Sequence, residues 1–174
     1  MGNSQHQILI PKQAGQRRLL ALDGGGIRGL ITLGILEKLE SDIRAKTQNP
    51  QLRLCDFFDF IGGTSTGAII ASGLAIGKTA AELISFYREK GPLMFSPEAL
   101  LTRLWNKYKS DPLEEELKRV FGADTTLGSG DVRTLLLIMM RNATTDSPWP
   151  FTNNPLSKYN SLSRADCNLH LHLW

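Results

Sequence analysis

The sequence has few cysteines, no long apolar run and little net charge. Its two cysteines, Cys55 and Cys167, cannot build a disulfide framework, and their spacing does not match a zinc site. The longest apolar stretches, residues 68–76 and 135–140, fall far short of the roughly 18 to 20 residues that cross a bilayer. We therefore expect a protein of a reducing compartment, cytoplasmic or peripheral to a membrane, without structural disulfides or a bound metal.

The charged residues are nearly balanced and are scattered along the chain. Twenty Lys and Arg against 17 Asp and Glu leave a net charge of +3 at pH 7. A nucleic-acid-binding surface needs clustered basic residues with aromatic side chains, and the densest basic group here is Lys12, Arg17 and Arg18. We therefore expect no nucleic-acid partner, and nothing in the sequence indicates the oligomeric state.

Length and hydropathy predict one folded domain after a short arm. The chain has 174 residues, of which 41% are hydrophobic, and this is enough to build a packed core. Residues 1–17 are mostly polar, so we predict a flexible arm there. No repeat or linker divides residues 18–174, which are expected to form the single domain.

Apolar residues alternate between strand and helix patterns in the first half of this domain. Residues 18–22 form a short apolar run that stops at a glycine turn, as a buried parallel strand does. Apolar residues then recur every three or four positions over residues 30–43, which predicts a helix to about Lys46. A second apolar run at residues 57–62 is followed from Ala68 by a nearly uncharged segment, which predicts a strand and then a buried helix.

The second half contains helix-start signals and one more strand pattern. Thr79 and Glu82 form a capping box that opens a helix, which we expect to end at Gly91-Pro92. Three further elements are predicted, helices at 97–107 and 112–121 and a strand at 135–140, the last followed by a polar loop to about residue 158. The alternation predicts an α/β fold, a three-layer α/β/α sandwich with a mainly parallel sheet.

The run Gly63-Thr64-Ser65-Thr66-Gly67 fits the G-x-S-x-G pattern, in which a serine nucleophile sits on a sharp strand-to-helix turn. The predicted strand before it and the predicted helix after it supply the setting that this turn requires. The helix N-terminus behind Ser65 would stabilise negative charge that develops there. We interpret Ser65 as a nucleophile supported by Gly63 and Gly67, and a purely structural turn is the alternative.

A second glycine motif, Asp-Gly-Gly-Gly-Ile-Arg-Gly at residues 23–29, also lies between a strand and a helix. Gly24, Gly25 and Gly26 would expose adjacent backbone N–H groups that can hold an oxyanion or a phosphate. The spacing also fits the G-x-G-x-x-G pattern of a dinucleotide site, but such a site needs a strand ending in an acid about 20 residues later. That window here continues a helix, so we favour oxyanion donors and keep a nucleotide- or anion-binding module as the alternative function.

In this order, the two motifs resemble the opening half of the patatin-like phospholipases. The resemblance implies a lipid acyl hydrolase, a phospholipase A or esterase, that cleaves phospholipids or other acyl lipids at a membrane surface and needs no cofactor. It assigns the nucleophile to Ser65, the oxyanion hole to Gly24, Gly25 and Gly26, and a supporting role to Arg28 and Gly29.

Patatin-like enzymes pair this serine with an aspartate in a later Asp-Gly-Gly or Asp-Gly-Ala motif, and here the resemblance breaks. The one Asp-Gly pair in the sequence, Asp23-Gly24, belongs to the first motif. We therefore expect an incomplete catalytic domain whose dyad aspartate lies beyond Trp174. Residues 1–174 alone should be nearly inactive, because a positioned base contributes roughly 10²- to 10⁴-fold to such reactions.

A Ser-Asp-His triad is a further alternative within the chain. The α/β-hydrolases place their triad in the chain order Ser, Asp, His. The candidates in that order after Ser65 are Asp131, Asp146, Asp166, His170 and His172.

Overall fold

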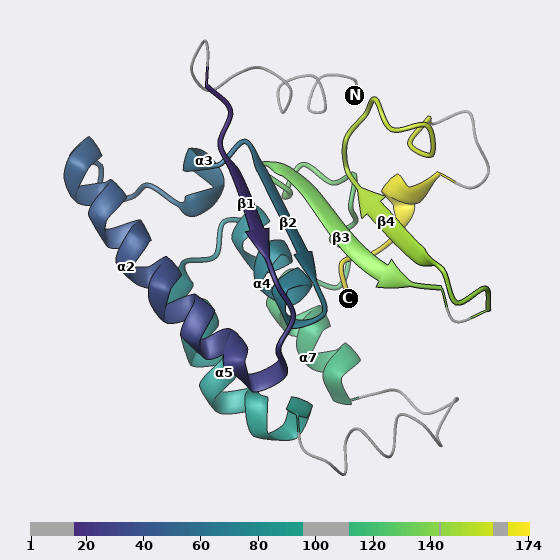
Figure 1. The fold of residues 1–174 in the computed structure, drawn as a ribbon, viewed down its shortest axis with the longest axis horizontal. Helices are drawn as coiled ribbons and strands as arrows, with labels where there is room; N and C mark the ends of the chain where they lie inside the picture. Colours follow the sequence, from purple (N-terminus) through teal and green to yellow (C-terminus); the bar gives the residue numbers. More distant parts are fainter. Residues whose placement is uncertain (1–15, 96–111, 143, 162–166) are drawn as a thin grey trace.

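Four strands form one sheet in the computed structural model, which describes residues 16–95, 112–142, 144–161 and 167–174 (Figure 1). The strands are β1 (Leu19–Leu22), β2 (Phe60–Thr64), β3 (Leu135–Arg141) and β4 (Pro148–Thr152), in this spatial order. The first three strands run parallel, whereas β4 pairs with β3 in the antiparallel sense. The sheet is therefore mainly parallel, as predicted.

The helices predicted to about Lys46, from Ala68, from Thr79 and at 112–121 are present, whereas the short helices at residues 26–28, 54–57 and 168–170 were not predicted. The described helices are η1 (Gly26–Arg28), α2 (Gly29–Thr47), α3 (Leu54–Phe57), α4 (Thr66–Ala75), α5 (Ala80–Phe95), α7 (Pro112–Phe121) and η2 (Asn168–His170). Helix α4 packs against β1, β2 and β3, while α2 and α5 pack against each other. Figure 1 shows α4 behind β1 and β2, with the pair α2 and α5 beside it.

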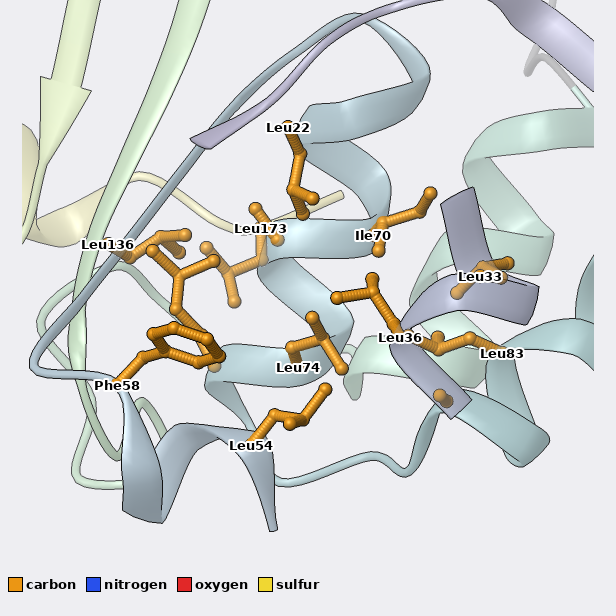
Figure 2. Packing of buried hydrophobic residues seen from close by; sticks show 14 of the residues in the cluster. Leu22, Leu33, Leu36, Leu54, Phe58, Ile70, Leu74, Leu83, Leu136 and Leu173 are labelled. Atoms are coloured by element: carbon orange, nitrogen blue, oxygen red, sulfur yellow. The ribbon is translucent and has the colours of Figure 1, made fainter. Parts of the chain in front are cut away.

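The hydrophobic core lies between the sheet and α4 and extends among α4, α2 and α5. Every residue of α4 except Ile69 is buried, as its lack of charge predicts. Figure 2 shows Leu22 of β1 and Leu136 of β3 in the same cluster as Ile70 and Leu74 of α4. Each such side chain contributes about 1.5–3 kcal/mol relative to an exposed one. This packing fixes the ends of β1 and β2 against the start of α4, where both glycine motifs lie.

The start of α5 is held from two sides. The predicted capping box is confirmed, because the N–H of Thr79 donates to Oε2 of Glu82 (2.7 Å) and the N–H of Glu82 donates to Oγ1 of Thr79 (3.0 Å). The buried carboxylate of Glu40 in α2 also accepts the N–H of Ala80 (3.3 Å). Burial raises the pKa of Glu40, although Arg44 Nη2 lies 3.0 Å from its Oε1. Helices α2 and α5 are thereby joined by polar contacts as well as apolar ones.

Two predictions about local structure are wrong. Helix α5 continues through Gly91-Pro92 to Phe95. A Gly-Pro pair favours a helix end, but a helix can accommodate a proline at the cost of one backbone hydrogen bond and crowding of the carbonyl four residues earlier. The polar loop predicted to reach residue 158 contains β4, whose Pro148 and Pro150 lie on an edge strand, where a missing N–H is tolerated. The helix predicted at 97–107 and residues 1–15 of the predicted arm lie outside the described residues.

Candidate active site

Ser65 lies on a strained turn between β2 and α4. Its backbone angles, φ 50° and ψ −124°, fall in a region that L-residues rarely adopt. Such strain persists only where the surrounding structure enforces it. The carbonyl of Ser65 accepts the N–H groups of Ala68 (2.9 Å) and Ile69 (3.3 Å), so the first turn of α4 begins directly behind the serine. Because Ser65 is exposed, the turn presents a serine at the surface beside a helix N-terminus.

The two glycines that flank this turn allow very close backbone contacts. A Cβ on Gly63 would lie 2.2 Å from the carbonyl oxygen of Gly67. A Cβ on Gly67 would lie 2.3 Å from the carbonyl oxygen of Leu22 at the end of β1. Neither clash could be relieved by rotating a side chain, because the partner atom is backbone in both cases. The turn that carries Ser65 is therefore held from both sides by main chain.

The glycine turn after β1 lies directly against Ser65. Strands β1 and β2 pair with Leu22 opposite Gly63, so the two strands end at the same edge of the sheet. A Cβ on Gly24 would lie 2.9 Å from the Cβ of Ser65. The structure therefore brings the two sequence motifs into contact, although 41 positions separate these two residues in the printed sequence.

Some of the remaining residues of the glycine turn are exposed to solvent, and others are buried in the core. Gly25 is exposed, and its carbonyl accepts the N–H of Arg28 (3.2 Å) at the exposed end of η1. Gly26 has φ 58°, which glycine adopts without steric cost. Gly29 is buried, and a Cβ there would lie 2.6 Å from Cγ2 of Thr66. Gly24 is therefore the glycine of this turn that lies against Ser65, and consecutive glycine N–H groups at such a turn can form an oxyanion hole.

A cavity of about 770 Å³ opens beside Ser65. Its walls are mostly apolar and include Ile69 of α4, Leu117 and Phe121 of α7, and Met139 of β3. The volume lies within the range of about 300–1,000 Å³ that is usual for small-molecule sites. Ser65 is therefore placed at the edge of a hollow large enough for part of an organic substrate.

Two residues of the alternative triad line the same cavity, but they are engaged elsewhere. Asp146 forms an ion pair with Arg141, and the ring of His172 stacks on Trp174 with 4.9 Å between ring centroids. Among the described residues, no hydrogen bond links Asp146, His172 and Ser65. Of the other triad candidates, Asp131 accepts a hydrogen bond from the hydroxyl of Ser129 (3.3 Å), and His170 is exposed. Asp166 lies outside the described residues. Within the part of the chain that the structure describes, the geometry therefore does not assemble a Ser-Asp-His triad.

Replacing His172 with glutamine is expected to reduce esterase turnover by less than about tenfold, because only packing in the cavity is lost. A triad histidine would cost roughly 10³- to 10⁴-fold or more. Steady-state hydrolysis of a p-nitrophenyl ester by the gene-encoded protein measures the difference. His170→Gln serves as the control, because His170 does not line the cavity. A loss of turnover near 10⁴-fold in His172→Gln, but not in His170→Gln, would support the Ser-Asp-His triad.

The described residues contain no metal-binding cluster and no helix that could span a membrane. Within residues 16–95, 112–142, 144–161 and 167–174, no three His, Cys, Asp or Glu side chains are grouped so that they could hold a metal ion. None of the helices in these ranges combines the length and the apolar character needed to cross a bilayer.

Sequence reasoning missed the residues that surround the two motifs. The helix-start signal before residue 112 predicts a helix over 112–121, but it does not say that Leu117 and Phe121 face a cavity beside Ser65. Tyr87 counts in the sequence only as an apolar position of a helix, whereas its hydroxyl donates to the carbonyl of Thr66 (3.1 Å). Both contacts depend on how distant helices are placed, so no local signal reveals them.

Residues 20–166 match the sequence model of the patatin-like phospholipases, and the chain belongs to this family. It is 37% identical over 136 residues to a cGAMP-activated phospholipase of Escherichia coli, and the match covers 75% of this chain and 38% of that protein. It is also 37% identical over 129 residues to Patatin-17 of Solanum cardiophyllum, covering 67% of this chain and 33% of that protein. The predicted family is therefore confirmed, and the chain spans between a third and two fifths of the length of these relatives.

The fold is similar to that of a solved structure. The heterodimeric complex ExoU-SpcU from the type III secretion system of Pseudomonas aeruginosa contains a chain that matches with a TM-score of 0.55 at 17% identity, over 90% of this chain and 34% of that one. The predicted fold class is confirmed, because the mostly parallel sheet with its helices is consistent with a three-layer α/β/α arrangement of the patatin-like kind.

Proposed function

We propose that this chain supplies the nucleophile and the oxyanion hole of a lipid acyl hydrolase, a phospholipase A or esterase. Ser65 is the nucleophile, and the backbone N–H groups of Gly24, Gly25 and Gly26 hold the oxyanion. The observation that carries the proposal is the contact between Gly24 and a serine held at φ 50°. A strained serine pressed against a glycine turn is costly to build and is typical of a functional site.

The other glycines and the arginine of the two motifs have supporting roles. Gly63 and Gly67 permit the backbone approaches that hold the turn, and buried Gly29 lets the glycine turn pack on Thr66. Arg28 lies exposed at the end of η1, where its positive charge can help to hold an anionic group or the loop.

The reaction proceeds in two halves. The Oγ of Ser65 attacks the ester carbonyl carbon while a base takes its proton, and the carbonyl oxygen becomes an oxyanion that the glycine N–H groups stabilise. The ester C–O bond then breaks, and the alcohol leaves with that proton. Water, deprotonated by the same base, attacks the acyl-serine and releases the fatty acid and the free enzyme. No cofactor is required for any of these steps.

The base that completes this reaction is an aspartate of a Ser-Asp dyad. Residues 1–174 contain no Asp-Gly-Gly or Asp-Gly-Ala motif after Ser65, so we place this aspartate outside them. The chain then provides one half of the dyad together with the oxyanion hole. The 174 residues alone should hydrolyse esters poorly for the same reason.

The substrate class follows from the cavity beside Ser65. Its largely apolar walls suit an acyl chain, while Arg141 and Asp146 at the cavity are polar groups that suit the more polar end of a lipid. Together with membership of the family, these walls support a phospholipid or another acyl lipid as the substrate, reached by peripheral contact with a membrane surface.

The test uses the protein at the length that its gene encodes, incubated with phosphatidylcholine vesicles, with fatty acid release as the readout. We expect release by the wild type and none above background by Ser65→Ala, because the acyl group is carried on the Oγ of Ser65 in the proposed reaction. One relative, Probable inactive patatin-3-Kuras 1 of Solanum tuberosum, is named as inactive, so family membership alone does not decide the question.

A protein of residues 1–174 is assayed beside the gene-encoded protein. We expect it to release fatty acid more slowly, by a factor of roughly 10² or more. Thermal stabilisation by a nucleotide in a protein that releases no fatty acid would favour the nucleotide-binding alternative. Equal turnover by Ser65→Ala and wild type would overturn the proposal.

A further inference from the structure

The strained turn at Ser65 is braced from behind by a side chain of another helix. The hydroxyl of Tyr87 in α5 donates to the carbonyl of Thr66 (3.1 Å), the residue that follows the serine. Tyr87 is fully buried, and burial raises its pKa, so the phenol stays protonated as a donor. This hydrogen bond joins the first turn of α4 to α5 across 21 positions of sequence.

Gly29, the last residue of the glycine motif, lies close to both Tyr87 and Thr66. A Cβ on Gly29 would lie 2.6 Å from Cγ2 of Thr66 and 3.3 Å from Cε1 of Tyr87. Thr66 and the ring of Tyr87 therefore both lie against Gly29 at the start of α2. The residue next to the serine, the end of the glycine turn and the tyrosine form one packed unit.

Helix α5 is a firm support for this unit. Its first turn is fixed by the capping box of Thr79 and Glu82 and by the carboxylate of Glu40. Along its length it packs against α2, the helix that the glycine turn begins. A hydrogen bond from α5 to Thr66 therefore couples the turn at Ser65 to the part of the fold that also sets the glycine turn.

We propose that Tyr87 is a positioning residue, which holds the backbone at Ser65 and Thr66 in place relative to Gly24–Gly26. The inference rests on the proposed function of Ser65 as a nucleophile. The hydroxyl acts on the backbone and does not touch the reacting atoms. Its loss leaves a folded protein in which the serine is less precisely held, and a displacement of about 1 Å at a reacting group can cost roughly 10² in rate.

The experiment compares Tyr87→Phe with Thr134→Val in the gene-encoded protein. Thr134 is a matched control, because its buried hydroxyl also donates to a distant backbone carbonyl, that of Phe58 (2.8 Å), at the start of β3 away from Ser65. Hydrogen exchange of the peptide covering residues 61–72 reports on the turn, whether or not the protein is active. Inactivation by a fluorophosphonate reports on Ser65, with the maximal rate and the half-saturating concentration measured separately.

In Tyr87→Phe we expect exchange in residues 61–72 to rise several-fold while exchange elsewhere is unchanged. The maximal inactivation rate should fall by about tenfold, with the half-saturating concentration unchanged. In Thr134→Val the exchange of residues 61–72 and the maximal inactivation rate should both match the wild type. Unchanged exchange at 61–72 in Tyr87→Phe, or an equal rise throughout the protein, would overturn the inference. A wild type that is not labelled at all would instead count against the proposed nucleophile, and the exchange data would still decide the role of Tyr87.

Discussion

Replacing Gly67 with alanine is expected to destabilise the protein by about 3 kcal/mol or more. The new Cβ would lie 2.3 Å from the carbonyl oxygen of Leu22 and 2.7 Å from that of Asp23. Both partners belong to the main chain at the end of β1, so the only relief is to move α4 away from the sheet. That movement would open the core between α4 and the three parallel strands. Urea unfolding of the wild type and the variant measures the change in the free energy of unfolding.

Gly34→Ala is the matched control for this prediction. Gly34 lies on the exposed side of α2, and a Cβ there would meet nothing within 4 Å. Alanine is favoured over glycine inside a helix, so this variant should gain up to about 1 kcal/mol. If Gly67→Ala were as stable as the wild type, the close approach of α4 to β1 would be wrong.

Replacing Gly24 with alanine is expected to lower the reactivity of Ser65 by roughly 10²-fold while the protein stays folded. A Cβ at this position would lie 2.9 Å from the Cβ of Ser65 and 3.2 Å from the carbonyl oxygen of Thr64. Gly24 is exposed, so the turn can move outward without disturbing the core, but that movement displaces the N–H groups from the oxyanion. The rate of fatty acid release and the melting temperature are measured together.

The control for this prediction is Gly130→Ala. Gly130 is exposed, and a Cβ there would meet nothing within 4 Å, so both its activity and its melting temperature should match the wild type. Full activity in Gly24→Ala would show that the glycine turn does not act on the serine. A collapse of the melting temperature in the same variant would instead assign Gly24 a structural role.

The sequence predicts the two motifs and their immediate setting because the signals are local. A short apolar run, a group of glycines and a change to helical period lie within a few residues of each other at both turns. The strands β1 and β2 and the helices α2 and α4 follow from these signals. Parallel pairing then brings the two turns to one edge of the sheet, and the contact between Gly24 and Ser65 agrees with that expectation.

The surroundings of the site could not be predicted, because they depend on tertiary packing. The pair Gly91-Pro92 is a strong local signal for a helix end, yet α5 continues through it. The prolines of residues 148–152 argue against a strand, yet an edge position next to β3 accommodates them. The hydrogen bond from Tyr87 to Thr66 and the cavity wall from α7 arise only once the helices are placed on the sheet.

If Ser65 is a reactive serine held against an oxyanion hole, a serine-directed reagent should modify it selectively. The most direct measurement treats the gene-encoded protein with a fluorophosphonate and locates the adduct by mass spectrometry of the digested protein. We expect a single modified peptide in which the phosphonate is on Ser65, and no adduct in Ser65→Ala. An adduct on a different residue, or an unmodified Ser65 in a protein that still releases fatty acid from vesicles, would contradict this expectation.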